Sequence, residues 1–239
     1  MKAIIIGATS GIGRELAIQM TAKGYELGIT GRRTELLETL NVQLGGKAHL
    51  KVMDITNFEQ ARQQLFDLIA TMGGVDIVVI NSGVGDMSLR WDIEQNIINT
   101  NATGFAAIAN AAFYYFSKNG SGQIVGISSV AAERAGGLSP SYHATKAFAS
   151  RYMDGLRLHA KRKKLPITIT DIRPGFVKTP MTARNDPKQM AWVATVEKAS
   201  AQIITAMEKK QRLAYITRRW AIAAWIMRNM PEWLYARLA

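Results

Sequence analysis

The sequence predicts an α/β fold, a doubly wound parallel sheet with helices on both faces. Short apolar, β-branched segments alternate with segments of helical period, which is typical of parallel strands joined by crossover helices. The first apolar segment, Lys2–Ile6, runs into a glycine-rich turn and then a helical pattern. With 239 residues, of which 48% are hydrophobic and 20% charged, the chain can form one domain with a sizeable core.

The composition excludes several kinds of site. Cysteine is absent, which excludes disulfides, thiolate metal sites and a cysteine nucleophile. The three histidines, His49, His143 and His159, lack metal-ligand spacing, so we expect no metal. The net charge of +12 suits nucleic acid, an anionic membrane surface or a polyanionic cofactor. No nucleic-acid motif is present, so we expect no such partner. No secretory or membrane-spanning segment is apparent, which predicts a cytoplasmic protein.

The glycine-rich turn after the first strand predicts a diphosphate site. Its glycines are Gly7, Gly11 and Gly13, with Ser10 and Ile12 among the intervening residues. Glycines let the backbone turn tightly and approach a ligand, and the next helix directs its N-terminal amides at phosphates. A glycine turn alone could be a tight connection, but the order strand, turn, helix favours nucleotide binding.

The second predicted strand, Tyr25–Thr30, ends without an acidic residue. An acid at such a position binds a ribose 2′-hydroxyl, whereas an arginine accommodates a 2′-phosphate. Arg32 and Arg33 stand there, so we expect NADP(H) rather than NAD(H). The alternative is that these arginines are the solvated start of the helix predicted over Thr34–Leu44.

The third predicted strand, Ala48–Met53, is followed by Asp54 and Ile55. Asp54 could simply help to cap the helix that begins near Asn57.

The fourth, Asp76–Ile80, is followed by Asn81, Ser82 and Gly83. We interpret Asn81 first as a support of the sheet and second as a neighbour of the cofactor.

A long helical segment, Trp91–Lys118, contains a locally unfavourable tract. Asn99, Asn101 and Gly104 lie within it, and asparagine and glycine are poor helix formers. A break of this kind frees a backbone carbonyl to bind water or a side chain.

The fifth strand, Gln123–Ile127, delivers Ser128 and Ser129 to its carboxyl end, where open α/β sheets bind ligands. There is no Gly-x-Ser-x-Gly elbow and no evident His or acid partner, so a nucleophilic serine is not expected.

The stretch Ser139–Lys164 predicts a helix that carries chemistry. Ser139 or Ser141 can cap its first amides. Tyr142 and Lys146 lie four apart and leave the same face. A phenol titrates near 10, and a fixed ammonium would lower that pKa; a shift of about three units requires roughly 4 kcal/mol. Tyr-x-x-x-Lys arises by chance on many helices, but the motifs that precede it favour a catalytic role.

The remaining segments complete the sheet and add an extension. Residues 161–164 form a basic helix end that suits the macrodipole. We expect a sixth strand over Pro166–Ile172 and a lid over the pocket at Met181–Trp192. A helix over Thr195–Lys209 and an edge strand over Leu213–Thr217 follow. Residues 218–239 are apolar and basic but too short to span a bilayer. We expect them to pack on the domain or a second subunit, or to lie in a membrane interface.

Taken in this order, the motifs resemble the short-chain dehydrogenase/reductase family, in its smaller single-domain branch. The resemblance covers residues 1–217, which we expect to be one dinucleotide-binding and catalytic domain, and implies a Rossmann-type sheet of strand order 3-2-1-4-5-6-7. It implies that Tyr142 donates a proton, Lys146 lowers the Tyr142 pKa and binds the nicotinamide ribose, and Ser129 holds the substrate oxygen. It also implies that Asn101, three residues before Gly104, positions a water.

The resemblance further implies a set of cofactor contacts. These are Gly7, Ser10, Gly11, Ile12, Gly13, Arg32, Arg33, Asp54, Ile55, Asn81, Gly83, Tyr142, Lys146, Pro174, Gly175, Val177 and Thr179. The chain departs from the family at Ile6, where threonine is frequent, at Ile80 and Ser82 in the Asn-Asn-Ala-Gly turn, and at Ser10, where some NADP-preferring relatives have a basic residue.

By this resemblance we expect hydride transfer between NADP(H) and a carbonyl/alcohol substrate. Met87, Met181, Met190 and Trp192 suggest an apolar substrate. The family often pairs its two long helices, here Asn96–Ser117 and Tyr142–Lys161, so we expect a homo-oligomer. The alternatives are a cofactor sensor or scaffold without turnover, and a membrane-peripheral reductase of lipid-like substrates.

Overall fold

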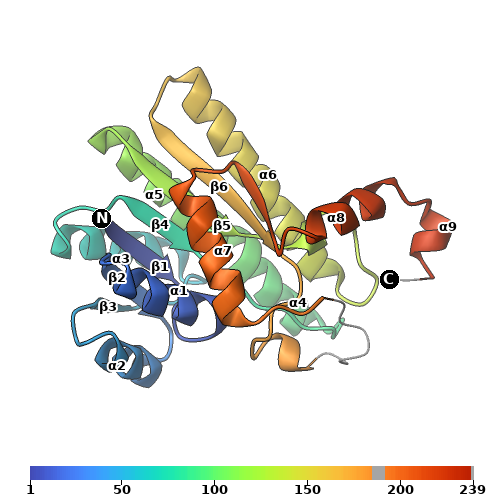
Figure 1. Ribbon diagram of the computed structural model, residues 1–239, viewed down its shortest axis with the longest axis horizontal. Coiled ribbons are helices and arrows are strands. Elements are labelled where there is room, and N and C mark those ends of the chain that lie inside the picture. The colour runs from blue at the N-terminus through green and yellow to red at the C-terminus, as the bar shows by residue number, and fades with distance from the viewer. Residues whose placement is uncertain (185–191, 238–239) are drawn as a thin grey trace.

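A parallel sheet of seven strands organises the chain (Figure 1). The computed structural model describes residues 1–184 and 192–237. The strands are β1 Lys2–Ile6, β2 Glu26–Gly31, β3 His49–Val52, β4 Ile77–Ile80, β5 Gly122–Ile127, β6 Ile167–Pro174 and β7 Leu213–Ile216. Their order is β3-β2-β1-β4-β5-β6-β7, and every pairing is parallel, which confirms the predicted topology.

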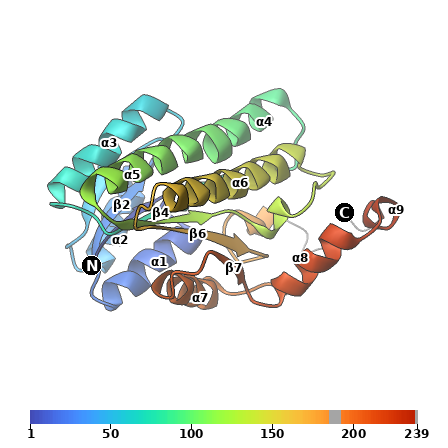
Figure 2. The ribbon, with the colours of Figure 1, turned by 90° about the horizontal axis from the view of Figure 1, so that it is seen from above.

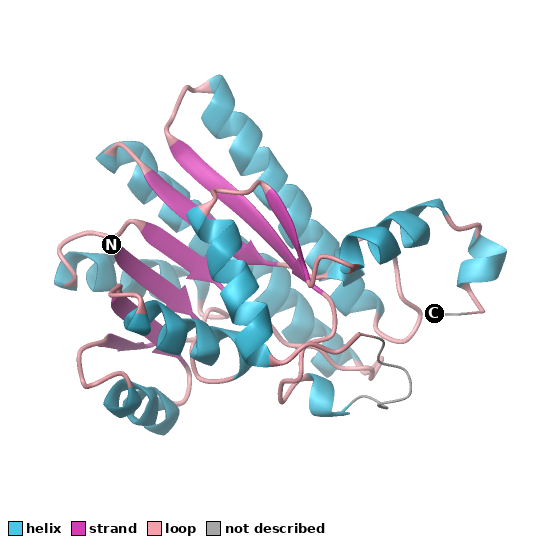
Figure 3. Ribbon diagram, viewed as in Figure 1, coloured by secondary structure: helices cyan, strands magenta, loops and turns pink. Residues whose placement is uncertain are grey.

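Helices connect the strands and lie on both faces of the sheet (Figure 3). They are α1 Gly11–Ala22, α2 Thr34–Gln43, α3 Phe58–Thr71, α4 Trp91–Ile98, α5 Phe105–Asn119, α6 Pro140–Arg162, α7 Val196–Glu208, α8 Trp220–Asn229 and α9 Glu232–Tyr235. Short 3-10 turns occupy Val130–Ala132 and Thr182–Arg184.

Two apolar cores hold the layers together. Helices α3, α5 and α6 cover one face, and α1, α2 and α7 cover the other (Figure 2). Strand β1 shows how one segment serves both cores, because successive side chains of a strand point to opposite faces. Ile4 and Ile6 belong to the first core and Ile5 to the second, all with no exposed surface. This explains why the strand reads as a continuous apolar run.

The sheet order reverses between β1 and β4, and this reversal positions the site. Chain connections leave β1 toward β2 on one side and return to β4 on the other. The loops at the carboxyl ends of these strands therefore diverge and leave a crevice. The turn at residues 7–13 follows β1, and Asn81 follows β4, so both predicted cofactor segments open into this crevice.

The predicted break in the long helix is a π-helical turn. Residues Asn99–Gly104 widen the helix between α4 and α5. A Cβ at Gly104 would come within 2.6 Å of the Ile55 carbonyl oxygen, so only glycine lets the turn pack here. The unfavourable asparagine–glycine tract thus marks a real change in helix geometry.

Some expected details differ from the structure. Ser139 precedes α6, but its hydroxyl donates to the Asp86 carbonyl instead of capping the helix with its side chain. The sixth strand, β6, runs two residues further than predicted, to Pro174, because Asp171–Pro174 pair with β7. Most of the predicted lid, with Pro187 and Met190, lies outside the described residues.

Candidate active site

A cavity of about 850 Å³ lies at the carboxyl ends of the strands. The predicted site residues that line it are Gly7, Ser10, Gly11, Ile12, Arg32, Arg33, Asp54, Ile55, Asn81, Gly83, Ser129, Tyr142, Lys146, Pro174, Gly175, Val177 and Thr179. Gly13 and Asn101 are not in this lining. They contact residues that are, because Gly13 packs against the Gly7 carbonyl and Asn101 bonds the backbone of Val84. Residues from the loops after six strands, and from helix α6, therefore converge on one cavity that is large enough for a dinucleotide.

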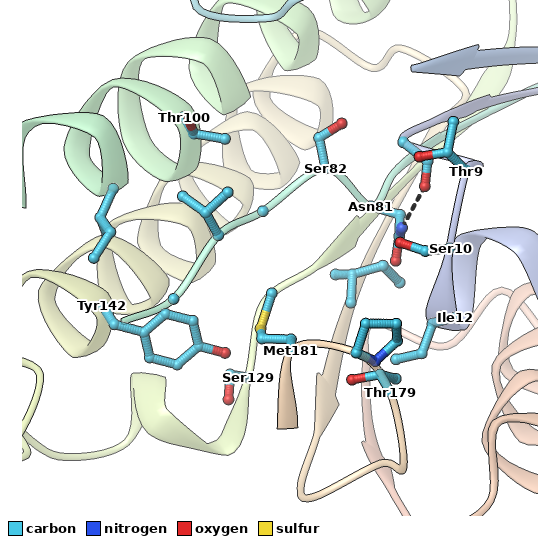
Figure 4. Close-up of a pocket in the computed structure, with 18 of the residues that line it drawn as sticks. Thr9, Ser10, Ile12, Asn81, Ser82, Thr100, Ser129, Tyr142, Thr179 and Met181 are labelled. Carbon is cyan, nitrogen blue, oxygen red and sulfur yellow. Dashed lines mark hydrogen bonds between the residues drawn. The ribbon is translucent and has the colours of Figure 1, made fainter. Parts of the chain in front are cut away.

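The glycine turn is shaped by close backbone contacts. Gly7 has a φ of +89°, and its carbonyl accepts a hydrogen bond of 2.7 Å from Asn81 Nδ2 (Figure 4). A Cβ at Gly13 would lie 2.1 Å from that same carbonyl oxygen. Helix α1 can approach the turn only because residue 13 has no side chain. Asn81 therefore supports the turn and also lines the cavity.

Two exposed arginines, Arg32 and Arg33, line the cavity at the end that we call its open end. Arg33 Nη2 donates to Thr9 Oγ1 at 2.8 Å and lies 3.4 Å from Ser10 Oγ. Arg32 lies 3.9 Å from Asp54, with more than half of its side chain exposed. Both guanidinium groups face the glycine turn and the β3 loop, and no acid follows β2. The arrangement leaves positive charge available to an anionic group.

Asp54 has a local role that differs from the capping alternative. Its Oδ1 accepts from the backbone N–H and the hydroxyl of Thr56, at 2.9 and 2.8 Å. This side chain closes the turn before α3 rather than bonding the amides of that helix, so the suggestion that Asp54 caps α3 is wrong.

Asn101 fastens the loop after β4 to the helices. Its Oδ1 accepts from Val84 N at 2.9 Å, and its Nδ2 donates to Val84 O at 2.7 Å and to Thr145 Oγ1 at 3.3 Å. A Cβ at Gly83 would lie 3.4 Å from Asn101 Oδ1 and 3.2 Å from Lys146 Nζ. Asn101 and Lys146 therefore approach the same backbone position, which glycine leaves open.

Tyr142 and Ser129 meet across the cavity. Figure 4 shows the Tyr142 hydroxyl directed toward Ser129. Ser129 lies between β5 and α6, where its hydroxyl accepts from Ala131 N at 3.1 Å. Ser128 points elsewhere and donates to Asp171 at 2.5 Å, so the first serine of the pair has a structural role.

The pKa of Tyr142 moves in the opposite direction from the expected one. Burial raises it above the ordinary value, and the hydrogen bond with Ser129 opposes the rise without cancelling it. Lys146 Nζ lies 5.7 Å from the centroid of the Tyr142 ring. Desolvation disfavours the phenolate more than its surroundings favour it. The expectation of a lowered Tyr142 pKa is therefore wrong for the protein alone.

Lys146 is buried, and its surroundings favour the neutral amine. Only 6% of the residue is exposed, and Nζ donates to the Ile127 carbonyl at 3.0 Å. Burial lowers its pKa to about 8, while the charge of Asp171 acts to raise it. An amine with such a pKa exchanges protons near neutral pH far more readily than an ordinary lysine does.

A buried ionic network beneath the site was not anticipated. Arg173 contacts Asp171 at 2.8 Å and also pairs with Glu133. Ser150, one turn after Lys146 on α6, donates to Asp171 at 2.8 Å. Asp171 and Arg173 alternate on one strand, so their shared face was visible as an i, i+2 pattern of opposite charges. Glu133 carried no such signal.

The contact of Trp220 with the site is a second feature that the sequence did not indicate, although residues 218–239 were expected to pack on the domain among other options. Its indole lies against Gly175, where an added Cβ would come within 2.0 Å of the ring. Phe176 and Trp192 meet the same indole edge-on, at centroid distances of 5.8 and 5.5 Å. The start of α8 therefore supports the Pro174–Gly175 turn from outside the cavity. Of the apolar residues expected in the substrate pocket, Met181 lines the cavity, whereas Met87 and Trp192 lie outside its lining.

No group of three or more His, Cys, Asp or Glu side chains that could hold a metal ion occurs in residues 1–184 and 192–237.

Comparison with known proteins identifies the family. The model of the short chain dehydrogenases matches residues 1–190. The chain belongs to the short chain dehydrogenase family. An uncharacterized oxidoreductase of Myxococcus xanthus is 36% identical over 191 residues, which are 77% of this chain and 75% of that protein. Serine 3-dehydrogenase of Rhizobium radiobacter is 32% identical over 189 residues, 75% of this chain and 73% of the relative.

A solved structure agrees with the fold of this short chain dehydrogenase. The short-chain type dehydrogenase/reductase of Mycobacterium ulcerans superposes with a TM-score of 0.77 at 21% identity, covering 90% of this chain and 86% of the other. Family membership makes the protein an oxidoreductase that transfers hydride and binds a nicotinamide cofactor. The cavity fits such a cofactor, because its glycine turn leaves open the backbone that a diphosphate approaches.

Proposed function

We propose that this protein is an NADP(H)-dependent oxidoreductase that interconverts a carbonyl group and an alcohol. One observation carries the proposal: Tyr142, Ser129 and Lys146 line the same cavity as the glycine turn and two arginines. When bound, the nicotinamide supplies or accepts the hydride. The chain provides placement and proton transfer.

In the direction of reduction, Tyr142 donates its proton to the carbonyl oxygen. Its raised pKa keeps the phenol protonated at neutral pH, as a donor must be. The Ser129 hydroxyl, toward which Tyr142 points, binds the same oxygen and orients it. Lys146 binds the nicotinamide ribose and, with a pKa of about 8, returns a proton to Tyr142. Asn101 positions a water that connects Lys146 to solvent, beside the position that Gly83 leaves open.

Substitution of Tyr142 tests the reaction. We expect Tyr142→Phe to lower kcat/KM by about 10²- to 10⁴-fold for NADPH oxidation with a panel of ketones and aldehydes. Tyr114→Phe is the matched control, because Tyr114 is 56% exposed on α5. Activity of Tyr142→Phe within tenfold of wild type would contradict the proposal. Tight NADPH binding by the wild type without turnover of any carbonyl would favour a cofactor sensor.

The preference for NADP(H) is proposed from the open end of the cavity. Arg33 contacts the glycine turn, Arg32 is exposed beside it, and no acid is present after β2 to bind a 2′-hydroxyl. We expect Arg33→Ala to lower kcat/KM for NADPH about 10- to 100-fold with little change for NADH. Arg151→Ala, on the surface of α6, is the control. An equal loss with both cofactors would refute the preference.

We also propose that the protein is a homo-oligomer that acts on an apolar substrate. Large side chains of α5 and α6, such as Tyr114, Phe148 and Leu158, are exposed where the family pairs its long helices. Met181 adds an apolar side chain to the cavity wall near Tyr142. Cytoplasmic location remains a prediction from the sequence.

A further inference from the structure

Helix α8 exposes an apolar face on the side opposite the domain. Trp220 and Ala224 face inward and are buried. Ile222, Trp225 and Ile226 recur at the spacing of a single helix face and are 63%, 63% and 43% exposed. A surface helix ordinarily carries polar residues on that side. Here the outward side carries three large apolar side chains.

The domain holds this helix in a fixed orientation. Arg134 donates to the Met227 carbonyl at 2.7 Å and to the Met230 carbonyl. Arg228 lies 3.3 Å from Glu133, whose carboxylate belongs to the buried network under the site. Figures 1 and 2 show α8 and α9 extending from one side of the layered body. The outward face of α8 is therefore presented as a preformed surface rather than as a loose tail.

The charges around this face select its partner. Residues 218–239 contain four arginines and one glutamate, in a chain of net charge +12. Arg218 and Arg219 precede α8, and Arg237 lies over the exposed Trp233 ring at 5.7 Å. A second copy seated on this face would bring arginines against arginines. An anionic lipid surface complements them, and tryptophan favours the headgroup region of a bilayer.

We propose that residues 218–237 dock the protein on the surface of an anionic lipid bilayer. Ile222, Trp225 and Ile226 enter the boundary between headgroups and acyl chains, with Trp233 beside them and the arginines among the phosphates. No described helix is long and apolar enough to cross a membrane, and α8, at about 15 Å, lies along the interface.

This docking also indicates a class of substrate, and that part of the inference rests on the proposed function. Trp220 opens α8 and touches the Gly175 turn, and the half-exposed Trp192 packs on Trp220. Helix α8 therefore carries the docked face on its outer side and, on its inner side, the indole that packs against the Gly175 turn of the cavity. Docking would hold the cavity close to the bilayer surface, where a substrate dissolved in the membrane is concentrated. The class that fits is a carbonyl or alcohol carried on a lipid-like, apolar molecule.

Co-sedimentation of the full chain with vesicles tests the docking. The vesicles are phosphatidylcholine alone, or phosphatidylcholine with roughly 30% phosphatidylglycerol. We expect binding to the anionic vesicles, weakened by salt, and a loss of about tenfold or more in Trp225→Gln. Trp91→Gln is the matched control, because Trp91 is 66% exposed at the start of α4, and it should bind like the wild type. Circular dichroism checks that both variants fold.

Three results of the co-sedimentation would overturn the inference. They are failure of the wild type to bind anionic vesicles, equal binding to phosphatidylcholine alone, and an equal loss in Trp91→Gln. A dimer in sedimentation velocity without lipid that Trp225→Gln converts to monomer would assign the face to a second copy instead. Turnover of a water-soluble carbonyl is measured separately. If the wild type turns over that carbonyl but does not bind anionic vesicles, this inference fails and the proposed reaction stands. If it binds the vesicles but turns over no carbonyl, the proposed reaction fails and the docking stands.

Discussion

The two ends of the cavity use charge in opposite ways. At the open end, Arg32 is 57% exposed and only 3.9 Å from its nearest acid, Asp54. At the closed end, Lys146 is buried, and the network beneath it joins Arg173 to Asp171 at 2.8 Å. A solvated cation interacts weakly with the protein and remains available to a ligand. A buried cation is stable only while neighbouring groups pair with it or accept its hydrogen bonds. Basic side chains are therefore exposed at one end of the cavity and desolvated or paired with acids at the other.

The largest expected effect comes from removing a buried charge. Asp171→Asn leaves Arg173 with Glu133 as its remaining acid partner, so we expect a loss of about 3–5 kcal/mol in the free energy of unfolding. It also removes a charge that raises the pKa of Lys146, which should fall further. Urea denaturation measures the first effect.

The matched control is an exposed pair. Asp67 lies 3.7 Å from Lys51 on the surface, and Asp67→Asn should cost about 0.5 kcal/mol or less. Similar losses in the two variants would mean that burial does not distinguish the two pairs, and the comparison would fail.

A second prediction concerns the pH dependence set by Lys146. Its folded pKa is about 8 against an ordinary 10.5, so the unfolded chain binds more protons between these values. The unfavourable contribution of its charge to stability is therefore full below pH 8 and disappears as the pH rises toward 10.5. We expect the unfolding free energy of Lys146→Met, minus that of wild type, to be about 3 kcal/mol larger at pH 7 than above pH 10.5.

Lys23→Met is the control for this titration, because Glu208 raises the pKa of Lys23 instead of lowering it. A constant difference between Lys146→Met and wild type across the pH range would show that the amine is not desolvated.

The smallest effect expected concerns the shape of the closed end. Gly175→Ala places a methyl group 2.0 Å from the Trp220 ring, so we expect a loss of about 1–3 kcal/mol in thermal or urea unfolding. Gly155→Ala is a control of opposite sign: it lies within α6 with open space around it and should gain up to about 1 kcal/mol. A tolerated alanine at position 175 would show that Trp220 moves away easily.

The fold could be predicted from the sequence because its signals are local. Apolar runs such as Lys2–Ile6, a glycine turn and the Asn99–Gly104 tract each act within a few residues, and their order implied the sheet. The predicted residues of the cavity lining likewise carry local signals, since most follow a strand end and Tyr142 and Lys146 share one face of α6. What could not be predicted depends on contacts between distant segments.

Three features illustrate that limit. Trp220 reaches Gly175 across a strand and a helix, and Glu133 finds Arg173 across forty residues. The direction of the Tyr142 pKa depends on how much water the folded chain excludes, which spacing along a helix does not report. The Tyr-x-x-x-Lys pattern placed both groups on one face but did not reveal that burial raises the pKa of Tyr142.

The paired hydrogen bonds of Asn101 have a consequence for the chemical ageing of the protein. One side chain accepts from the Val84 amide and donates to the Val84 carbonyl at the same time. Deamidation would replace the donor by a carboxylate oxygen, which cannot donate and would face the carbonyl with like partial charge. Asn101 would then no longer bond both backbone groups of Val84, and the loop between the Lys146 amine and the π-helical turn would lose this anchor.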